Sequence, residues 1–276
     1  MIARDYITQW SVGAPWPQRQ QIEQDLILSR LILEIAGDSL LGKEFAFRGG
    51  TCLHKLHLPQ ALRYSEDLDY VRGTRGSIGP YIDALREITE RAGLIEKSRE
   101  LTGQMAHFIC TSPAEDGGEI RIKIEVNIAE TESFLPRTTR LYAVDSRWWS
   151  GRVGVSTFEI EELMSTKLRA LYQRRKGRDL FDLWHALTDL RPNEQLVIDG
   201  LAHYMGDEIF TYRELAANLA AKLEHPDFLT DLNTLIVGAP GDYNILTAAD
   251  LLMERLGARL KNAPSSAEIA NGAWRQ

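Results

Sequence analysis

Residues 119–128 alternate strictly between polar and apolar side chains. The apolar positions are Ile120, Ile122, Ile124, Val126 and Ile128, and the polar positions between them are Arg121, Lys123, Glu125 and Asn127. Successive side chains on a β-strand point to opposite faces of its sheet, so this pattern predicts a strand with one buried face and one polar face. The chain is therefore expected to build a sheet that covers a core on one side.

A second predicted strand, within residues 64–71, carries two aspartates one residue apart, Asp67 and Asp69. Both carboxylates are expected on one face of the strand, while Leu68 and Tyr70 turn into the core. Aspartate is depleted in strands, so this pair favours a functional role, and two carboxylates can hold Mg²⁺. The alternative for an isolated Asp-x-Asp is a solvated surface or a turn.

Glu125 offers a third carboxylate from a separate strand and is a candidate metal ligand. Lys123 lies two residues earlier on the same face of that strand. A simple ion pair between Lys123 and Glu125 on an exposed sheet face is therefore the alternative.

Gly49, Gly50 and Thr51 stand where a predicted strand at 44–48 passes into a predicted helix at 51–58. Backbone N–H groups and the Thr51 hydroxyl at such a turn can bind a phosphate group. The GxxxxGK[ST] spacing of a P-loop is absent, and an ordinary tight turn is the alternative.

Residues 150–155 have the composition of a loop, and strand patterns stop after them. We therefore place a domain boundary there. Residues 1–150 form the first predicted domain, which contains the strands, and residues 151–276 form a second, mainly helical domain.

Five segments are predicted to be helical from apolar spacing or capping residues, namely 17–37, 81–92, 156–172, 211–223 and 247–261. Capping-box spacing marks the start of two of them, at Ser156 to Glu159 and at Thr211 to Glu214. Residues 107–111 form a further predicted strand. The polar stretch at 262–276 is expected to be frayed.

Composition excludes several classes of protein. The formal net charge is −7, so the chain lacks the excess of Lys and Arg that indiscriminate nucleic-acid binding needs. Two cysteines, Cys52 and Cys110, are too few for a disulfide framework. The opening residues lack the apolar region of a secretory signal, and no apolar run is long enough to span a membrane. We expect a cytoplasmic protein without a membrane partner.

Asp179 and Asp182 are three residues apart in a predicted helix and share one of its faces. Asp182 stands between two apolar residues, where a carboxylate without a partner would be costly, so we expect a partner for it. Lys167 is a candidate, and a lysine on a helix surface is the alternative. Residues 167–178 also carry a cationic cluster, which is either a solvated face or a phosphate-binding one.

Four segments resemble, in this order, the motifs of the AbiEii-type nucleotidyltransferase toxins, a group that includes the mycobacterial MenT toxins. They are Arg48-Gly49-Gly50-Thr51, Ser65-Glu66-Asp67-Leu68-Asp69, Glu161-Glu162-Leu163-Met164-Ser165-Thr166-Lys167-Leu168-Arg169-Ala170-Leu171 and Arg178-Asp179-Leu180-Phe181-Asp182-Leu183. The combination is more specific than any one of its parts. The region after Leu190 matches no motif of the group.

The resemblance implies an α+β fold, in which a DNA polymerase β-like nucleotidyltransferase core with a mixed sheet flanked by helices is followed by a helical domain. It implies Mg²⁺-dependent transfer of a nucleoside monophosphate from an NTP. Characterised relatives modify the 3′ acceptor end of tRNA and so block translation, and a cognate antitoxin neutralises each of them. The partners implied are therefore an NTP, tRNA and an antitoxin protein.

The resemblance also implies roles for particular residues. The catalytic residues that it implies are Asp67, Lys167, Asp182 and Ser65. The residues that it places around the nucleotide are Arg48, Gly49, Gly50, Thr51 and Lys167, with Lys167 on the triphosphate. Asp67 and Asp69, with Glu125 as the further candidate, are the expected metal ligands. Asp182 is expected to act as a metal ligand, as a base or as the group that orients Lys167, and the helical domain would thus contribute a lysine and an aspartate to the active site.

Two other functions stay open from the sequence. One is a regulator that binds a nucleotide or a partner protein without catalysis. The other is a nucleotidyltransferase that acts on a small molecule or on a protein hydroxyl, which the cationic cluster disfavours only weakly.

Overall fold

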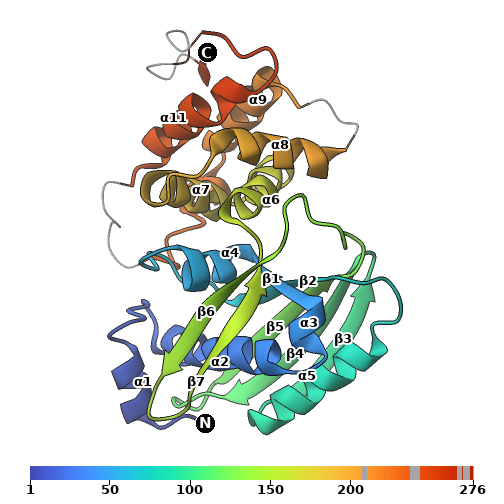
Figure 1. Cartoon of the computed structure of the whole chain (residues 1–276). Coiled ribbons are helices and arrows are strands. Elements are labelled where there is room, and N and C mark those ends of the chain that lie inside the picture. Colours follow the sequence, from blue (N-terminus) through green and yellow to red (C-terminus); the bar gives the residue numbers. More distant parts are fainter. Residues whose placement is uncertain (207–209, 237–242, 266–268, 270–273, 276) are drawn as a thin grey trace. The chain divides into compact units, whose positions relative to one another are not determined.

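The computed structural model describes residues 1–206, 210–236, 243–265, 269 and 274–275. The chain divides into two compact units, residues 1–158 and residues 159–276. The first unit holds the sheet, and the second consists of helices in the part that the structure describes (Figure 1).

The seven strands form one mixed sheet in the order β3-β4-β5-β2-β1-β7-β6. Their bounds are β1 (Phe45–Arg48), β2 (Asp67–Arg72), β3 (Ile95–Thr102), β4 (Met105–Pro113), β5 (Glu119–Asn127), β6 (Thr138–Asp145) and β7 (Ser150–Thr157). The pairs β2–β5 and β1–β7 are parallel, and the other neighbours are antiparallel. β5 has the predicted alternation, since its even-numbered residues from Ile120 to Val126 are buried.

The helical segments of the first unit are α1 (Arg4–Trp10), α2 (Arg19–Gly37), α3 (Leu41–Glu44), α4 (Gly49–Cys52), the π-helix η1 (Leu53–His57) and α5 (Gly79–Arg91). Helices α2 and α5 pack against the sheet (Figure 1). The predicted apolar stripe of α2 is its buried side, since Leu26, Leu31 and Ile35 are all shielded from solvent. The face of the sheet that α2 covers therefore packs into the core, and the opposite face carries polar side chains.

The second unit contains α6 (Ile160–Gln173), α7 (Gly177–Asp189), α8 (Glu194–Met205), α9 (Tyr212–Leu223), α10 (Pro226–Thr230), α11 (Ile245–Arg255) and the short 3₁₀ helix η2 (Gly257–Arg259). Its core is apolar and draws on α6, α7, α8, α9 and α11. The capping box predicted at Thr211 is present at the start of α9. The predicted fold class, a mixed sheet flanked by helices and followed by a helical part, is confirmed.

The prediction of a loop at residues 150–155 was wrong, because these residues belong to β7. β7 pairs with β6 along its whole length and meets β1 at Thr157. Two glycines in this strand, Gly151 and Gly154, made its sequence look like a turn. The Trp149 ring covers Gly151 so closely that an added Cβ would lie 2.6 Å from it. Strand pairing and this contact override the weak strand propensity of glycine.

The capping box predicted at Ser156 to Glu159 was also wrong, since Ser156 and Thr157 are strand residues and α6 begins at Ile160 with no side-chain cap. The helix expected at 51–58 begins earlier, at Gly49, and continues as the π-helix η1. Sequence patterns missed α1, β3 and β6 altogether. β3 and β6 are the two edge strands, where exposure removes the clean apolar alternation.

The stretch at 262–276 falls partly outside the described residues, which omit 266–268, 270–273 and 276. Ile269 and Trp274 are buried in the core of the second unit, so the expectation of a frayed end was wrong for them. The Trp274 indole N–H donates a hydrogen bond to Asp250 at 2.9 Å. Among the described residues, no helix is long and apolar enough to cross a membrane.

Candidate active site

The two aspartates of β2 lie on the polar face of the sheet. Leu68 and Tyr70, on the opposite face, are buried, whereas Asp67 and Asp69 are partly exposed. The side chains of β2 thus alternate as predicted from the sequence. Because β2 and β5 are parallel and in register, Asp69 stands beside Glu125, and the three predicted metal ligands share one face.

The turn after β1 packs directly against Asp69. Gly49 has a φ of 81°, and a Cβ on it would lie 2.1 Å from Oδ2 of Asp69. Only glycine fits here, for both conformational and steric reasons. The next residue, Gly50, is also crowded, since its Cβ would meet the Arg63 guanidinium at 2.5 Å and the Ser65 hydroxyl at 3.0 Å. The glycine pair therefore brings the backbone close to the carboxylates.

Thr51 and Ser65 connect this turn to the start of β2. The Thr51 hydroxyl donates to the backbone carbonyl of Asp67 at 2.6 Å and lies 2.9 Å from the Ser65 hydroxyl. Thr51 is only 1% exposed. Its hydroxyl holds the backbone of Asp67 in place. The contact with a phosphate that the sequence predicts for this hydroxyl stays a prediction.

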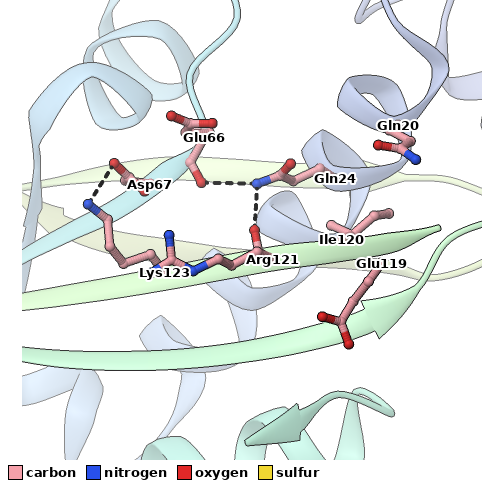
Figure 2. A pocket seen from close by; sticks show the side chains of 8 residues that line it. All are labelled: Gln20, Gln24, Glu66, Asp67, Glu119, Ile120, Arg121 and Lys123. Carbon is pink, nitrogen blue, oxygen red and sulfur yellow. Dashed lines mark hydrogen bonds and ion pairs between the residues drawn. The ribbon is translucent and has the colours of Figure 1, made fainter. Parts of the chain in front are cut away.

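Lys123 lies between two of the carboxylates. Its Nζ is 3.1 Å from Oδ2 of Asp67 and 3.2 Å from Oε2 of Glu125. Figure 2 shows the bond to Asp67. On the other side of Glu125, Nδ1 of His107 lies 2.8 Å from Oε1. The ion pair between Lys123 and Glu125, which the sequence left as the alternative for Glu125, is therefore present.

The acidity of Asp67 reflects this arrangement. Burial raises the pKa of Asp67, and the nearby Lys123 lowers it. The negative charges of Glu66 and Glu125 raise it further, so the pKa is raised overall. Burial alone would lower the pKa of Lys123, but the attraction of Asp67 and Glu125 raises it overall. Two carboxylates thus share one ammonium group, and the ionised form of Asp67 is stabilised by any further cation at this position.

Arg48, the last residue of β1, stands beside Asp69 in the β1–β2 pair. Its Nη1 lies 3.5 Å from Oε2 of Glu130. Glu130 also accepts a hydrogen bond from the Asn127 side chain at 3.2 Å. The guanidinium is therefore held at the polar face, and its expected contact with a nucleotide stays a prediction.

The donor set on this face suits a hard divalent cation. Carboxylate oxygens are the ligands that Mg²⁺ prefers, and it commonly takes one or two of them together with phosphate oxygens and water. Among the described residues no group of three or more His, Cys, Asp and Glu side chains is arranged to hold a metal. Asp67 and Asp69, the ligands predicted from the sequence, would supply two carboxylates of such a set. The ammonium group of Lys123 beside Asp67 supports this fit, because it shows that the position accepts a cation.

A pocket of about 200 Å³ opens beside Asp67 (Figure 2). Its lining residues are Gln20, Gln24, Glu66, Asp67, Glu119, Ile120, Arg121 and Lys123. Gln24 of α2 donates to the backbone carbonyls of Glu66, at 3.4 Å, and of Arg121, at 2.9 Å. This side chain links the residue before β2 to β5, so the pocket is a formed feature of the first unit.

The second unit contains a separate cluster of charged side chains. Asp179 and Asp182 of α7 are fully buried. Lys167 of α6 lies 3.2 Å from Oδ1 of Asp179 and 3.0 Å from Oδ2 of Asp182. The Arg174 guanidinium binds Asp179 through two nitrogens, at 2.7 and 2.9 Å. The expectation that Asp182 has Lys167 as a partner is confirmed.

The neighbouring cations determine the charge state of Asp179. Burial alone would raise the pKa of its carboxyl, but Lys167 and then Arg174 lower it overall. A carboxyl whose pKa is lowered by folding stabilises the protein above its ordinary pKa, and the stabilisation is lost as the pH falls through the folded-state value. The Asp179 carboxylate is therefore fully ionised at neutral pH.

Most members of the cationic cluster at 167–178 have partners within the second unit. Arg169 donates to the Tyr204 carbonyl at 3.2 Å, and Lys176 lies 3.7 Å from Asp231. These contacts favour a structural role for much of the positive charge. Arg175 is exposed and makes no ion pair with the residues that the structure describes.

Two residues near the carboxylates were not found from the sequence. His107 supports Glu125 from β4, and Arg63 fills the space beside Gly50. The contact of His107 depends on the register between β4 and β5, which alternation alone does not reveal. Arg63 lies in a stretch without strand or helix pattern, so no local signal pointed to it.

Comparison with known proteins relates this chain to nucleotidyltransferases. A family model described as "Nucleotidyl transferase AbiEii toxin, Type IV TA system" matches residues 30–250. The structure of MenT4, a nucleotidyltransferase toxin from Mycobacterium tuberculosis H37Rv, is similar at 16% sequence identity, with a TM-score of 0.63 and coverage of 100% of this chain and 94% of that chain. This likeness shows a shared fold.

An antigenic nucleotidyltransferase-like protein from Paracoccidioides brasiliensis matches at 18% identity with a TM-score of 0.36, over 80% of this chain and 97% of that chain. Among curated proteins, none matches the sequence of this chain.

We predict that Gly49→Ala destabilises the protein more than Gly93→Ala. Both glycines have a positive φ, 81° and 78°, but an added Cβ at Gly93 meets nothing within 4 Å. Each substitution carries a backbone cost of about 1–3 kcal/mol. Gly49→Ala should cost at least about 1 kcal/mol more, because the Asp69 carboxylate must move. Urea unfolding of the two variants measures the difference, and equal losses would show that the contact with Asp69 is not restrictive.

We also predict that Lys167→Met lowers the free energy of unfolding by about 3–5 kcal/mol, because it removes the ammonium group that two buried carboxylates share. Lys176→Met is the matched control, since Lys176 is exposed and lies 3.7 Å from its partner. Its loss should stay below about 1 kcal/mol. Similar losses for the two variants in urea unfolding would contradict a stabilising role for the buried cluster.

Proposed function

Because this chain belongs to the AbiEii family of nucleotidyl transferase toxins, we propose that it transfers a nucleoside monophosphate from an NTP to the 3′ acceptor end of tRNA, with Mg²⁺ as cofactor. The modified tRNA would no longer serve translation, and a cognate antitoxin would neutralise the toxin. The observation that carries the proposal is the pair of β2 carboxylates on one polar face, with the ammonium group of Lys123 held between Asp67 and Glu125.

Asp67 and Asp69 would hold Mg²⁺ against the triphosphate. The ion would neutralise charge on the phosphates and orient the α-phosphate toward the acceptor hydroxyl. The protein's own contribution is to keep both carboxylates in position before substrate binds. The Thr51 hydroxyl does this for the Asp67 backbone, and the close approach of Gly49 restricts the Asp69 side chain.

The residues around the glycine turn would bind the nucleotide. We propose that the backbone of Gly49 and Gly50, together with Arg48, contacts the phosphates, and that Thr51 and Ser65 position this turn. The contact between the Thr51 and Ser65 hydroxyls, and the hydrogen bond that the Thr51 hydroxyl donates to the Asp67 carbonyl, support a positioning role for both. Glu125 would assist as a third carboxylate once its contact with Lys123 is released.

Lys167 would bind the triphosphate, and Asp182 would orient the Lys167 side chain. Of the three roles that the sequence left open for Asp182, orientation of Lys167 is favoured by its complete burial and by the distance of 3.0 Å between the two groups. Asp179 would share this task, because it contacts the same ammonium group.

The transfer is tested with purified tRNA, Mg²⁺ and each NTP in turn, labelled on the α-phosphate. The proposal predicts label in RNA and release of pyrophosphate, with no label in RNA from a γ-labelled NTP. Periodate oxidation of the tRNA 3′ diol should abolish labelling, and so should EDTA. These two controls identify the acceptor group and the metal requirement separately.

Asp67→Asn should lower the transfer rate by about 10²-fold or more, because it removes a charge that binds the cation. Asp83→Asn is the matched control, since Asp83 lies on α5 and its side chain is 62% exposed. This control should retain the wild-type rate. Unchanged transfer by Asp67→Asn would reject the mechanism.

The same assay distinguishes the alternatives. A regulator that binds NTP without catalysis would release no pyrophosphate. A transferase for a small molecule or a protein hydroxyl would release pyrophosphate but leave RNA unlabelled, and mass spectrometry of the other products would reveal the acceptor.

The role of Lys167 is tested with Lys167→Arg, which keeps the positive charge in the buried cluster. The guanidinium is a planar fork and does not replace a compact ammonium group on both carboxylates and a phosphate. We expect the free energy of unfolding of Lys167→Arg to lie between those of the wild type and Lys167→Met. Under conditions where the variant is folded, its transfer rate should be at least about tenfold lower than that of the wild type. Wild-type transfer by Lys167→Arg would leave Lys167 with a structural role alone.

A further inference from the structure

The ammonium group of Lys123 lies beside carboxylates that would also bind a divalent cation. A cation bound there would repel it. The ammonium nitrogen of Lys123 is 3.1 Å from Oδ2 of Asp67, a predicted metal ligand, and 3.2 Å from Oε2 of Glu125. Mg²⁺ binds carboxylate oxygens at about 2.1 Å. An ion on the same oxygen of Asp67 and the ammonium group of Lys123 would therefore be like charges in close contact.

We propose that Lys123 is a built-in countercation that competes with the divalent metal for Asp67 and Glu125 and moves to the triphosphate when metal and nucleotide bind together. This inference rests on the proposed function, since it concerns the same carboxylates. It gives Lys123 a task of its own in the reaction, in addition to its ion pair with Glu125.

The register of the strands explains why Lys123 reaches both acids. Asp67 pairs with Lys123, and Asp69 pairs with Glu125, in parallel strands whose side chains share a face. Without a cation, the carboxylates on this face would repel one another. An ammonium group at this site neutralises them in the absence of metal and keeps the face ordered.

The surroundings allow Lys123 to leave. Its side chain is 27% exposed, and it lines the pocket beside Asp67 that Figure 2 shows. The four-carbon stem is flexible, and the pocket offers space for the displaced ammonium group. Glu125 keeps its orientation meanwhile, because His107 holds its other oxygen at 2.8 Å.

This exchange would link metal binding to nucleotide binding. Metal alone must displace the ammonium group from two carboxylates without offering it a new partner. Metal together with a triphosphate provides phosphate oxygens that Lys123 can bind. The protein would thus bind metal weakly when free of nucleotide and strongly in the presence of an NTP, a positive coupling between the two ligands.

The test measures binding of Mn²⁺ to the full-length protein by electron paramagnetic resonance at one fixed neutral pH, with and without a non-hydrolysable NTP analogue. Lys123→Met should bind Mn²⁺ about tenfold more tightly than wild type in the absence of nucleotide, a difference of ~1.4 kcal/mol. The gain in Mn²⁺ affinity that the analogue produces should be smaller in this variant than in the wild type. Lys123→Gln, which also lacks the charge, serves as a second variant if Lys123→Met does not fold.

Lys43→Met is the matched control. Lys43 is an exposed lysine of α3 in the same unit and does not line the pocket beside Asp67. This variant should bind Mn²⁺ as the wild type does. An equal gain in affinity from Lys43→Met would show a general charge effect and would overturn the proposal.

Two further outcomes separate this inference from the proposed function. Equal Mn²⁺ affinity in the wild type and the Lys123 variants would overturn the competition while leaving metal-dependent transfer intact. Absence of Mn²⁺ binding in every protein, with and without the analogue, would overturn both.

Discussion

The placement of two carboxylates on one strand is the constraint on which the first unit depends. β2 buries Leu68 and Tyr70 in the core and so fixes which way Asp67 and Asp69 point. A slip of one residue would bring both acids into the apolar side of the sheet at a large cost in desolvation. The core therefore determines the position of the polar site, and the glycine turn and the Thr51 hydroxyl complete it.

In each unit, one lysine is shared between two carboxylates. In the first, Lys123 is shared between Asp67 and Glu125, and in the second Lys167 is shared between Asp179 and Asp182. In the first unit, one lysine between two acids leaves net negative charge, so this site stays receptive to a further cation. In the second unit, Arg174 also binds Asp179, so two cations balance the two acids. The two lysines differ in burial, since the Lys123 side chain is 27% exposed and that of Lys167 is 11% exposed. This difference favours a mobile role for Lys123 and a fixed one for Lys167.

Much of this could be predicted from the sequence where a local pattern was sufficient. The alternation of polar and apolar residues predicted β5 and predicted that Asp67 and Asp69 lie on the polar face. The energetic cost of burying the carboxylate of Asp182 predicted a partner for it, with Lys167 as the candidate. What sequence patterns could not supply was strand order. The contacts of Lys123 and His107 follow from β2 lying beside β5 and from the register of β4, both of which join distant segments. β7 was missed because its glycines are stabilised by pairing and by a tryptophan ring, neither of which is visible locally.

The proposed function requires that the acids of β2 gather a divalent cation around a triphosphate. The most direct measurement is anomalous X-ray diffraction from crystals of the protein grown with Mn²⁺ and a non-hydrolysable NTP analogue. We expect an anomalous peak for an Mn²⁺ ion that is coordinated directly by Asp67, Asp69 and phosphate oxygens of the analogue. A triphosphate bound with its metal away from these two carboxylates would contradict it.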